Sequence, residues 1–246
     1  MKKKLLITMG CSFTEGVGCW DMSVTPNSAR QDGDEWSILL NHPKNKLKFH
    51  RDGWPNRVGK KLGFDKVINI AKGGGSTSGQ VKKFIKTIVP MDFSEYDVFI
   101  LFQLPNPNRF SFYSHRVVED LTPHHPNLLY EGYVKFIESD YDLFLEQIFY
   151  IDVMGELCKS KKFDFRTISL LTGNDIDYRF YRDNLNNKKE TPRMVLTLKE
   201  SLSPICGHPD EVGYEILSDS IVKYLKSEFK DFQNVLSKEE IEWEYL

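Results

Sequence analysis

The stretch Gly10-Cys11-Ser12-Phe13-Thr14-Glu15-Gly16-Val17-Gly18 directly follows a short apolar run, Leu5-Leu6-Ile7-Thr8-Met9. That run has the composition of a buried parallel strand, and a glycine marks where the strand ends. Open α/β sheets bind ligands beyond the carboxyl ends of their strands, so Ser12 lies where such a sheet would place a substrate. The glycines allow a sharp turn and a close approach to a bound group. A hydroxyl at this position can be a nucleophile, although glycine and serine also serve turn geometry alone at many strand ends.

Strand-like and helix-like segments alternate along the rest of the chain. Further apolar runs predict strands over 66–71, 96–103, 163–171 and 193–198. Helices are predicted over 54–62, 77–89, 133–160 and 210–229. In the last of these helices the positions expected to face the sheet are Val212, Ile216, Leu217, Ile221, Leu225 and Phe229. This alternation predicts an α/β protein with a doubly wound parallel sheet of about five strands.

Three segments do not follow this alternation. Residues 19–53 have the composition of a loop insertion, and residues 108–131 that of an aromatic-rich loop. Both follow predicted strand ends, so both can overhang a site there. The tail, 230–246, carries charged residues and Trp243 and predicts a short amphipathic helix. We expect one domain over 1–246.

Charge and composition exclude several classes of protein. A net charge of −2 over 246 residues gives no reason to expect a nucleic-acid partner or a polybasic membrane anchor. The apolar run after Lys4 is too short for a signal peptide, and recurring charges leave no transmembrane span. The four cysteines form no CxxC pair, which favours free thiols and a cytoplasmic location. His124-His125 lacks partners at metal-ligand spacing, so no metal is expected.

Three further segments carry polar groups to predicted strand ends. A triple glycine, Gly73-Gly74-Gly75, follows the second strand and offers bare N–H groups to an anion or oxyanion. Gln103-Leu104-Pro105-Asn106-Pro107-Asn108-Arg109 follows the third strand with amides and a guanidinium. Gly207-His208-Pro209 leads into the last helix, from which a histidine can reach the same edge of the sheet.

Together these four segments resemble the sequence blocks of the SGNH/GDSL hydrolase superfamily. Gly10 to Thr14 resembles the first block, with Ser12 as the nucleophile. The glycine segment resembles the second block, in which Gly74 would donate to the oxyanion. Gly207-His208-Pro209 resembles the last block, with His208 as the base. The resemblance implies a flavodoxin-like three-layer αβα sandwich that needs no cofactor.

The third block is the poorest match. Asn106 stands for the family's oxyanion asparagine, with Asn108 and Gln103 as alternatives, and the Ser12 N–H would complete the oxyanion site. Asn108 and Arg109 are candidate substrate-binding residues. Arg109 could bind an anionic substrate group or form a structural salt bridge.

Two departures from the family pattern concern the first and last blocks. Ile205 and Cys206 stand where the family carries the aspartate that orients the histidine. A backbone carbonyl could orient His208 instead; Asp210 is a further candidate, better explained as a charge in the first turn of a helix. Cys11 replaces the first-block aspartate, which is not a catalytic position. A disulfide or metal site could join Cys11 to Cys206. We favour the simpler interpretation that these two cysteines lie beside the candidate site residues by chance.

The resemblance implies a serine esterase that acts on small acyl esters, carbohydrate O-acyl esters or lipid esters, and aromatic loops suit stacking on a sugar. The alternative is an SGNH-fold protein with weak or no catalysis that serves in binding or assembly. The GCSFT form of the first block is similar to that of bacterial and phage-encoded members, where a virion-associated role is conceivable. A nucleotide-binding module is disfavoured, because no phosphate loop is present.

Overall fold

A computed structural model describes residues 2–26, 36–106, 109–114, 117–121, 140–169, 202–203 and 206–246. Its central sheet has five parallel strands in the order β6-β3-β1-β2-β7. These are β1 (Lys3–Met9), β2 (Lys66–Asn69), β3 (Tyr96–Leu104), β6 (Asp164–Ser169) and β7 (Glu242–Tyr245). The sheet confirms the predicted fold class.

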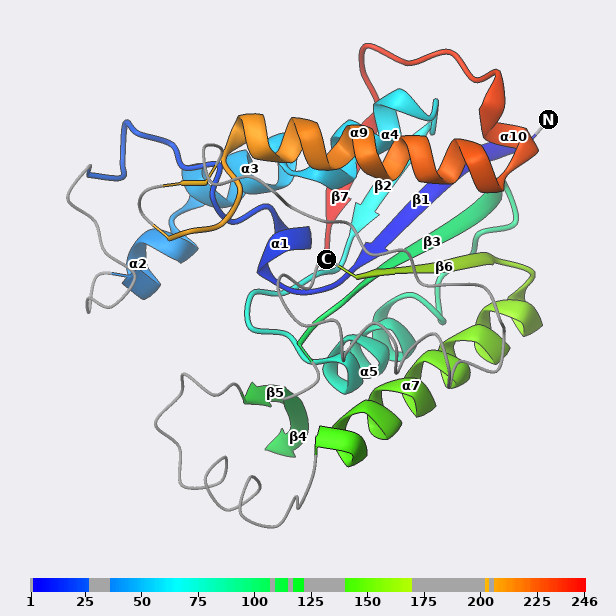
Figure 1. The fold of residues 1–246 in the computed structure, drawn as a ribbon, viewed down its shortest axis with the longest axis horizontal. Coiled ribbons are helices and arrows are strands. Elements are labelled where there is room, and N and C mark those ends of the chain that lie inside the picture. Colours follow the sequence, from blue (N-terminus) through cyan, green and yellow to red (C-terminus); the bar gives the residue numbers. More distant parts are fainter. Residues whose placement is uncertain are drawn as a thin grey trace.

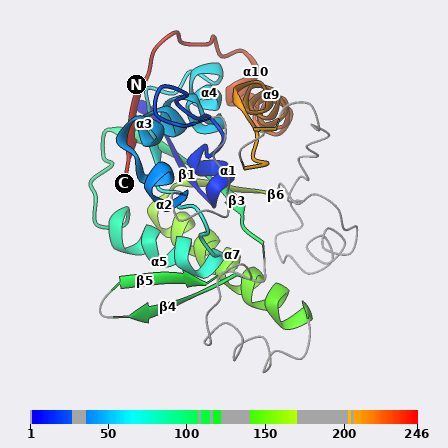
Figure 2. The same ribbon diagram turned by 90° about the vertical axis from the view of Figure 1, so that its left-hand side faces the viewer.

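Helices cover both faces of the sheet in three layers (Figures 1 and 2). One face packs against α4 (Trp54–Lys61) and α9 (Glu211–Glu228), the other against α5 (Thr77–Thr87) and α7 (Asp140–Lys161). Alternate residues of β1 divide between the two cores, since Leu6 faces the first and Leu5 and Ile7 the second. The apolar strands are therefore buried on both sides, as a parallel sheet requires.

The chain reverses its direction of winding at β1. From β1 it passes to β2 on one side, and later to β3 on the other, so β1 lies between them. A crevice opens beyond the carboxyl ends of the strands at such a switch point. The one-turn helix α1 (Ser12–Glu15) begins there, immediately after β1 (Figure 1).

The tail differs from its prediction. Only Lys230–Gln233 is helical there (α10), and Glu242–Tyr245 pairs with β2 as an edge strand, β7. The strand alternates acidic and aromatic residues, which is the period-two pattern of a strand rather than a helix. Lys66 pairs with Glu242 at 2.8 Å and Glu244 at 3.0 Å across this edge. The strand predicted over 193–198 lies outside the described residues.

The prediction of which residues in the last helix face the sheet was also partly wrong. Val212 is 60% exposed and Ile216 41% exposed, whereas Leu217, Ile221 and Leu225 are buried as expected. At 100° per residue, Val212 lies about 140° around the helix from Leu217, on its outer side. The sequence pattern placed too many apolar residues on one face.

The two segments expected to be loops contain regular structure. α2 (Trp36–Asn41) and α3 (Pro43–Asp52) lie within 19–53. His42 caps α3 by accepting from Lys44 N–H, and Pro43 sits in its first turn, a common helix start. In the second segment, β4 (Phe110–Ser114) and β5 (Val117–Leu121) form an antiparallel ribbon beside α5 (Figure 2).

No described helix is long and apolar enough to cross a membrane.

Candidate active site

Ser12 opens helix α1 at the carboxyl end of the central strand. Cys11 is the extended residue that precedes the helix. The first amides of any helix have no intrahelical acceptor, so the Ser12 N–H points out of the helix start. The side chain and the amide of Ser12 are thus presented at the same edge of the sheet.

The turn before Ser12 is held by two buried glutamine side chains. Gln80 Oε1 accepts from Gly10 N–H, and Gln103 Oε1 accepts from Cys11 N–H, each at 3.2 Å. Gln103 Oε1 also accepts from Thr14 Oγ1 at 3.1 Å, while its Nε2 donates to Leu104 O at 2.5 Å. Both ends of the Gln103 amide are engaged, and its oxygen holds the serine loop in place. A buried glutamine that ends an apolar strand is the sequence signal for such a role.

His208 meets Ser12 across the sheet edge. His208 Nε2 lies 2.7 Å from Ser12 Oγ, and Nδ1 lies 3.1 Å from Cys206 O. A carbonyl only accepts hydrogen bonds, so Nδ1 carries the hydrogen and Nε2 is left to accept from the serine hydroxyl. Of the groups considered for orienting His208, the one that contacts its Nδ1 in the structure is therefore a backbone carbonyl, that of Cys206. Asp210 instead caps α9 by accepting from Gly213 N–H at 2.9 Å.

Gly18 determines how closely the histidine loop approaches the serine loop. A Cβ at Gly18 would lie 2.1 Å from Pro209 O and 3.2 Å from His208 Cβ, and its φ is +125°. Only glycine fits both the conformation and the space. The ring of Phe13 packs on the imidazole with ring centroids 4.9 Å apart. These contacts hold the imidazole beside the Ser12 hydroxyl.

Burial lowers the pKa of His208 to about 4, and the positive charge of Arg109 acts in the same direction. The hydrogen bond to the Cys206 carbonyl opposes this shift. The imidazole is therefore neutral, and able to accept a proton, at pH values well below the ordinary pKa of histidine.

The triple glycine forms a turn next to Ser12. Gly75 N–H donates to Lys72 O at 2.8 Å, and Gly73 N–H donates to the Glu15 carboxylate at 2.6 Å. Gly74, with φ of +75°, lies between them, and its N–H has no acceptor among the described residues. Of the three amides, the one at Gly74 is therefore available to an oxyanion.

The segment after β3 is only partly described. Asn106 is exposed at the end of that strand, and Asn108 lies outside the described residues. Arg109 is half-buried, with Nε and Nη1 buried and without a hydrogen-bond partner. No described acidic residue forms an ion pair with Arg109. The salt bridge considered for it is thus absent from the described part of the chain.

Cys11 and Cys206 are buried and make separate contacts. Cys11 Sγ donates to Gln103 Oε1 at 3.2 Å, and Cys206 Sγ accepts from Trp20 Nε1 at 3.4 Å. All four cysteines are free thiols. Within the described residues, no group of three or more potential ligands could hold a metal.

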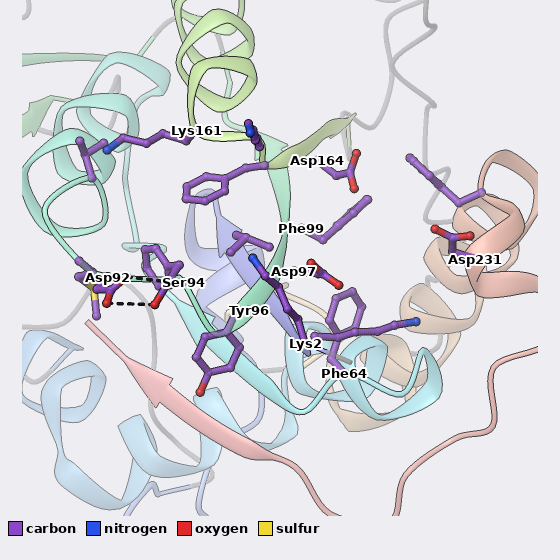
Figure 3. Close-up of a pocket in the computed structure, with 18 of the residues that line it drawn as sticks. Lys2, Phe64, Asp92, Ser94, Tyr96, Asp97, Phe99, Lys161, Asp164 and Asp231 are labelled. Carbon is purple, nitrogen blue, oxygen red and sulfur yellow. Dashed lines mark hydrogen bonds between the residues drawn. The ribbon is translucent and has the colours of Figure 1, made fainter.

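A cavity lies elsewhere in the described part of the chain (Figure 3). It has a volume of about 590 Å³ at the amino ends of β1, β3 and β6, and Asp97, Asp164 and Asp231 surround Phe99 there. Ser12 and His208 do not line it. This cavity is a different place from the serine–histidine pair.

Comparisons with solved structures identify the fold. A carbohydrate esterase whose active site is described as having divergent catalytic and non-catalytic binding functions aligns with a TM-score of 0.60 and 14% identity, over 94% of this chain and 67% of its own. A family two carbohydrate esterase from Clostridium thermocellum, in complex with cellohexaose, aligns with a TM-score of 0.54 and 13% identity, over 94% and 66%. A lipolytic protein of the G-D-S-L family from Desulfitobacterium hafniense DCB-2 aligns with a TM-score of 0.50 and 14% identity, over 89% and 98%. This chain has the SGNH hydrolase fold.

The likeness to SGNH hydrolases is one of fold, since identities of 13–14% carry no residue roles. The chain spans about two thirds of the length of the two carbohydrate esterases. No protein-family model and no curated protein matches the sequence. The resemblance noted from four short blocks is confirmed at the level of fold.

Proposed function

We propose that this protein is a serine ester hydrolase in which Ser12 is the nucleophile and His208 the general base. The observation that carries the proposal is the 2.7 Å contact between Ser12 Oγ and His208 Nε2. Hydrogen-bond contact between a hydroxyl and a neutral imidazole is the arrangement that activates a serine.

In this mechanism Ser12 Oγ attacks the acyl carbon of an ester while His208 Nε2 takes the hydroxyl proton. The carbonyl double bond opens to a tetrahedral oxyanion. As the oxyanion collapses, the bond to the alcohol breaks and His208 returns the proton to the leaving oxygen. Water, deprotonated by His208, then attacks the acyl-serine and releases the acid and the free serine.

Three donors would stabilise the oxyanion: Ser12 N–H, Gly74 N–H and the side-chain amide of Asn106. Ser12 N–H lies at a helix start, and Gly74 N–H lies in a turn. Neither amide has an intrachain acceptor among the described residues, which supports both as donors. Asn106 is supported by its place at the end of β3, next to the β1 end that carries Ser12.

His208 would work without a carboxylate behind it. The Cys206 carbonyl would fix the productive tautomer, which is one of the two things that the aspartate of a triad provides. The carbonyl carries no net charge, however, so it stabilises the imidazolium less. We expect a hydrolase with modest turnover.

The proposed substrates are small acyl esters or acylated carbohydrates. The two carbohydrate esterases among the structural neighbours support this class. Arg109 further favours a substrate with a negatively charged group near the ester, because buried guanidinium nitrogens without acceptors are costly unless an anion binds them. Asn108, its neighbour in sequence, is the second proposed substrate-binding residue.

Arg109 is tested by comparing an O-acetylated uronic acid with the matching neutral O-acetylated sugar. The Arg109→Met variant should lose about tenfold in kcat/KM on the acid, as expected for loss of a charge-assisted hydrogen bond, and change little on the neutral sugar. Equal losses on both substrates would reject a role in charge recognition.

The main proposal is tested by reaction with a fluorophosphonate, read by intact mass. Wild type should gain one adduct, and Ser12→Ala and His208→Ala should gain none. Hydrolysis of 4-nitrophenyl acetate should disappear in the same two variants.

A second candidate is a binding or assembly protein that keeps the fold with little catalysis, favoured by the absence of a carboxylate contact at His208 Nδ1. No adduct on wild type at high probe concentration would support this candidate and reject the esterase.

A further inference from the structure

A buried carboxylate, that of Glu15, lies three residues after Ser12 on the same one-turn helix. Glu15 is 1% exposed. Its Oε2 accepts from Gly73 N–H at 2.6 Å, and its Oε1 forms an ion pair with Lys46 from α3. The nucleophile, the glycine turn and the segment 19–53 therefore meet at one side chain.

The glycine turn depends on this carboxylate for its position. Of its amides, Gly75 N–H closes the turn on Lys72 O, and Gly73 N–H is bound by Glu15. With both neighbouring amides held by hydrogen bonds, fewer directions are open to the Gly74 N–H between them. A Cβ built on Gly73 would lie 3.9 Å from Ser12 Cβ, so the turn passes directly beside the nucleophile.

Lys46 explains why a carboxylate can be buried here. An isolated buried charge is strongly unfavourable, and the Lys46 ammonium offsets that cost. Tyr245, from β7, donates to Ala71 O at 3.0 Å at the start of the glycine segment. Burial, and then the charge of Glu15, raise the pKa of Tyr245. Contacts from α3 and β7 thus converge on the glycine turn.

We propose that Glu15, held by Lys46, is a positioning residue that aims the Gly74 N–H at the oxyanion formed on the Ser12 adduct. Because Ser12 and Glu15 share one helical turn, the carboxylate fixes the donor and the nucleophile relative to each other. Pre-aligned donors act on the transition state more than on the bound ester. This inference rests on the proposed esterase function.

The test compares Glu15→Gln with wild type on 4-nitrophenyl acetate and on a boronic acid, which forms a tetrahedral adduct with an active serine. The amide keeps the shape of the side chain but loses its charge. We expect kcat to fall about 10- to 100-fold, while KM stays within threefold of the wild-type value. This fall in kcat is somewhat smaller than the fall caused by complete removal of an oxyanion donor. Affinity for the boronic acid should fall by a similar factor.

A matched control is Glu215→Gln. Glu215 is an ion-paired carboxylate on α9, bonded to Arg57 and Lys61, and it does not contact the glycine turn. This variant should keep kcat and boronic acid affinity within twofold of wild type.

Loss of the charge could unfold the protein, because Lys46 would then lack its partner. The double variant Glu15→Gln/Lys46→Met removes both charges and avoids a half-buried ammonium without a partner. It should melt close to wild type and still show the lowered kcat. Restored kcat in a folded double variant would overturn the inference, as would unchanged kcat in folded Glu15→Gln.

Failure of the esterase proposal gives a different result. Wild type would then show neither fluorophosphonate labelling nor hydrolysis, and both proposals would be rejected together. Labelled, active wild type with an equally active Glu15→Gln variant rejects only the role of Glu15.

Discussion

The two edges of the parallel sheet differ in what they offer to a ligand. The amino edge has a cavity of about 590 Å³, with aromatic residues and acidic side chains around it (Figure 3). The carboxyl edge has Ser12 and His208 in hydrogen-bond contact, beside a turn with an available amide. Covalent catalysis needs a nucleophile, a base and oxyanion donors at one point, and the proposed mechanism assigns these roles to groups at the carboxyl edge.

The reason for this difference lies in the chain path. Strand ends at the carboxyl edge of a doubly wound sheet lead into helices, so first-turn amides gather there. At the amino edge, helices end and strands begin. The cavity at that edge is lined by residues of α10, β3 and β6, and its size alone does not indicate chemistry.

The largest expected effect comes from removing the reacting pair. Ser12→Ala and His208→Ala should each lower kcat/KM for 4-nitrophenyl acetate by at least about 1000-fold, since the residues act as a unit. The double variant should be no slower than either single variant. Additive losses, measured by steady-state hydrolysis, would contradict a shared role.

Gly18→Ala should have the next largest effect, because a Cβ there would lie 2.1 Å from Pro209 O and 3.2 Å from His208 Cβ. The histidine loop must move, so we expect a loss of at least about tenfold in kcat and a destabilisation of about 2 kcal/mol. Chemical denaturation and hydrolysis rates measure the two effects.

Gly207→Ala is the matched control, since it also has a positive φ, +65°, but no atom within 4 Å of the added Cβ. It should cost about 1 kcal/mol through backbone strain and change kcat less. Equal loss of kcat in both variants would show that the close approach at Gly18 is unimportant.

The pH profile should sharpen the comparison further. His208 accepts a proton only when neutral, and its pKa is lowered to about 4. We therefore expect kcat/KM to rise through a midpoint near pH 4 and stay level through pH 6.5, with buffers of constant ionic strength. Arg109→Met should move this midpoint to higher pH, because the charge of Arg109 helps to lower the pKa. A midpoint near 6.5 in wild type would contradict the structure.

The smallest effect on catalysis is expected from a substitution at the amino edge of the sheet. Asp97→Ala changes a residue that lines the large cavity and is exposed. It should leave kcat/KM within twofold of wild type, because no contact links it to Ser12. A large loss would show that the two edges are coupled.

Much of the fold could be predicted from local pattern. Apolar runs located β1, β2, β3 and β6, and alternation with helices predicted a parallel sheet. β7 was missed because Glu242-Trp243-Glu244-Tyr245 is short, and its partner, β2, is far away in the sequence. Within 19–53, α3 was missed because its polar composition resembles that of a loop, although Pro43 marks its start.

The sequence by itself determined which groups could react: a serine after a strand, a glycine turn and a histidine before a helix. Only the tertiary structure decided how they are held. The Cys206 carbonyl orients His208, Gln103 holds the serine loop, and Glu15 with Lys46 binds the glycine turn. Local pattern fixes strands and turns because it depends on neighbouring residues. Polar contacts join residues that are far apart in the sequence, 196 positions in the case of Ser12 and His208, and exist only once the sheet has brought them together.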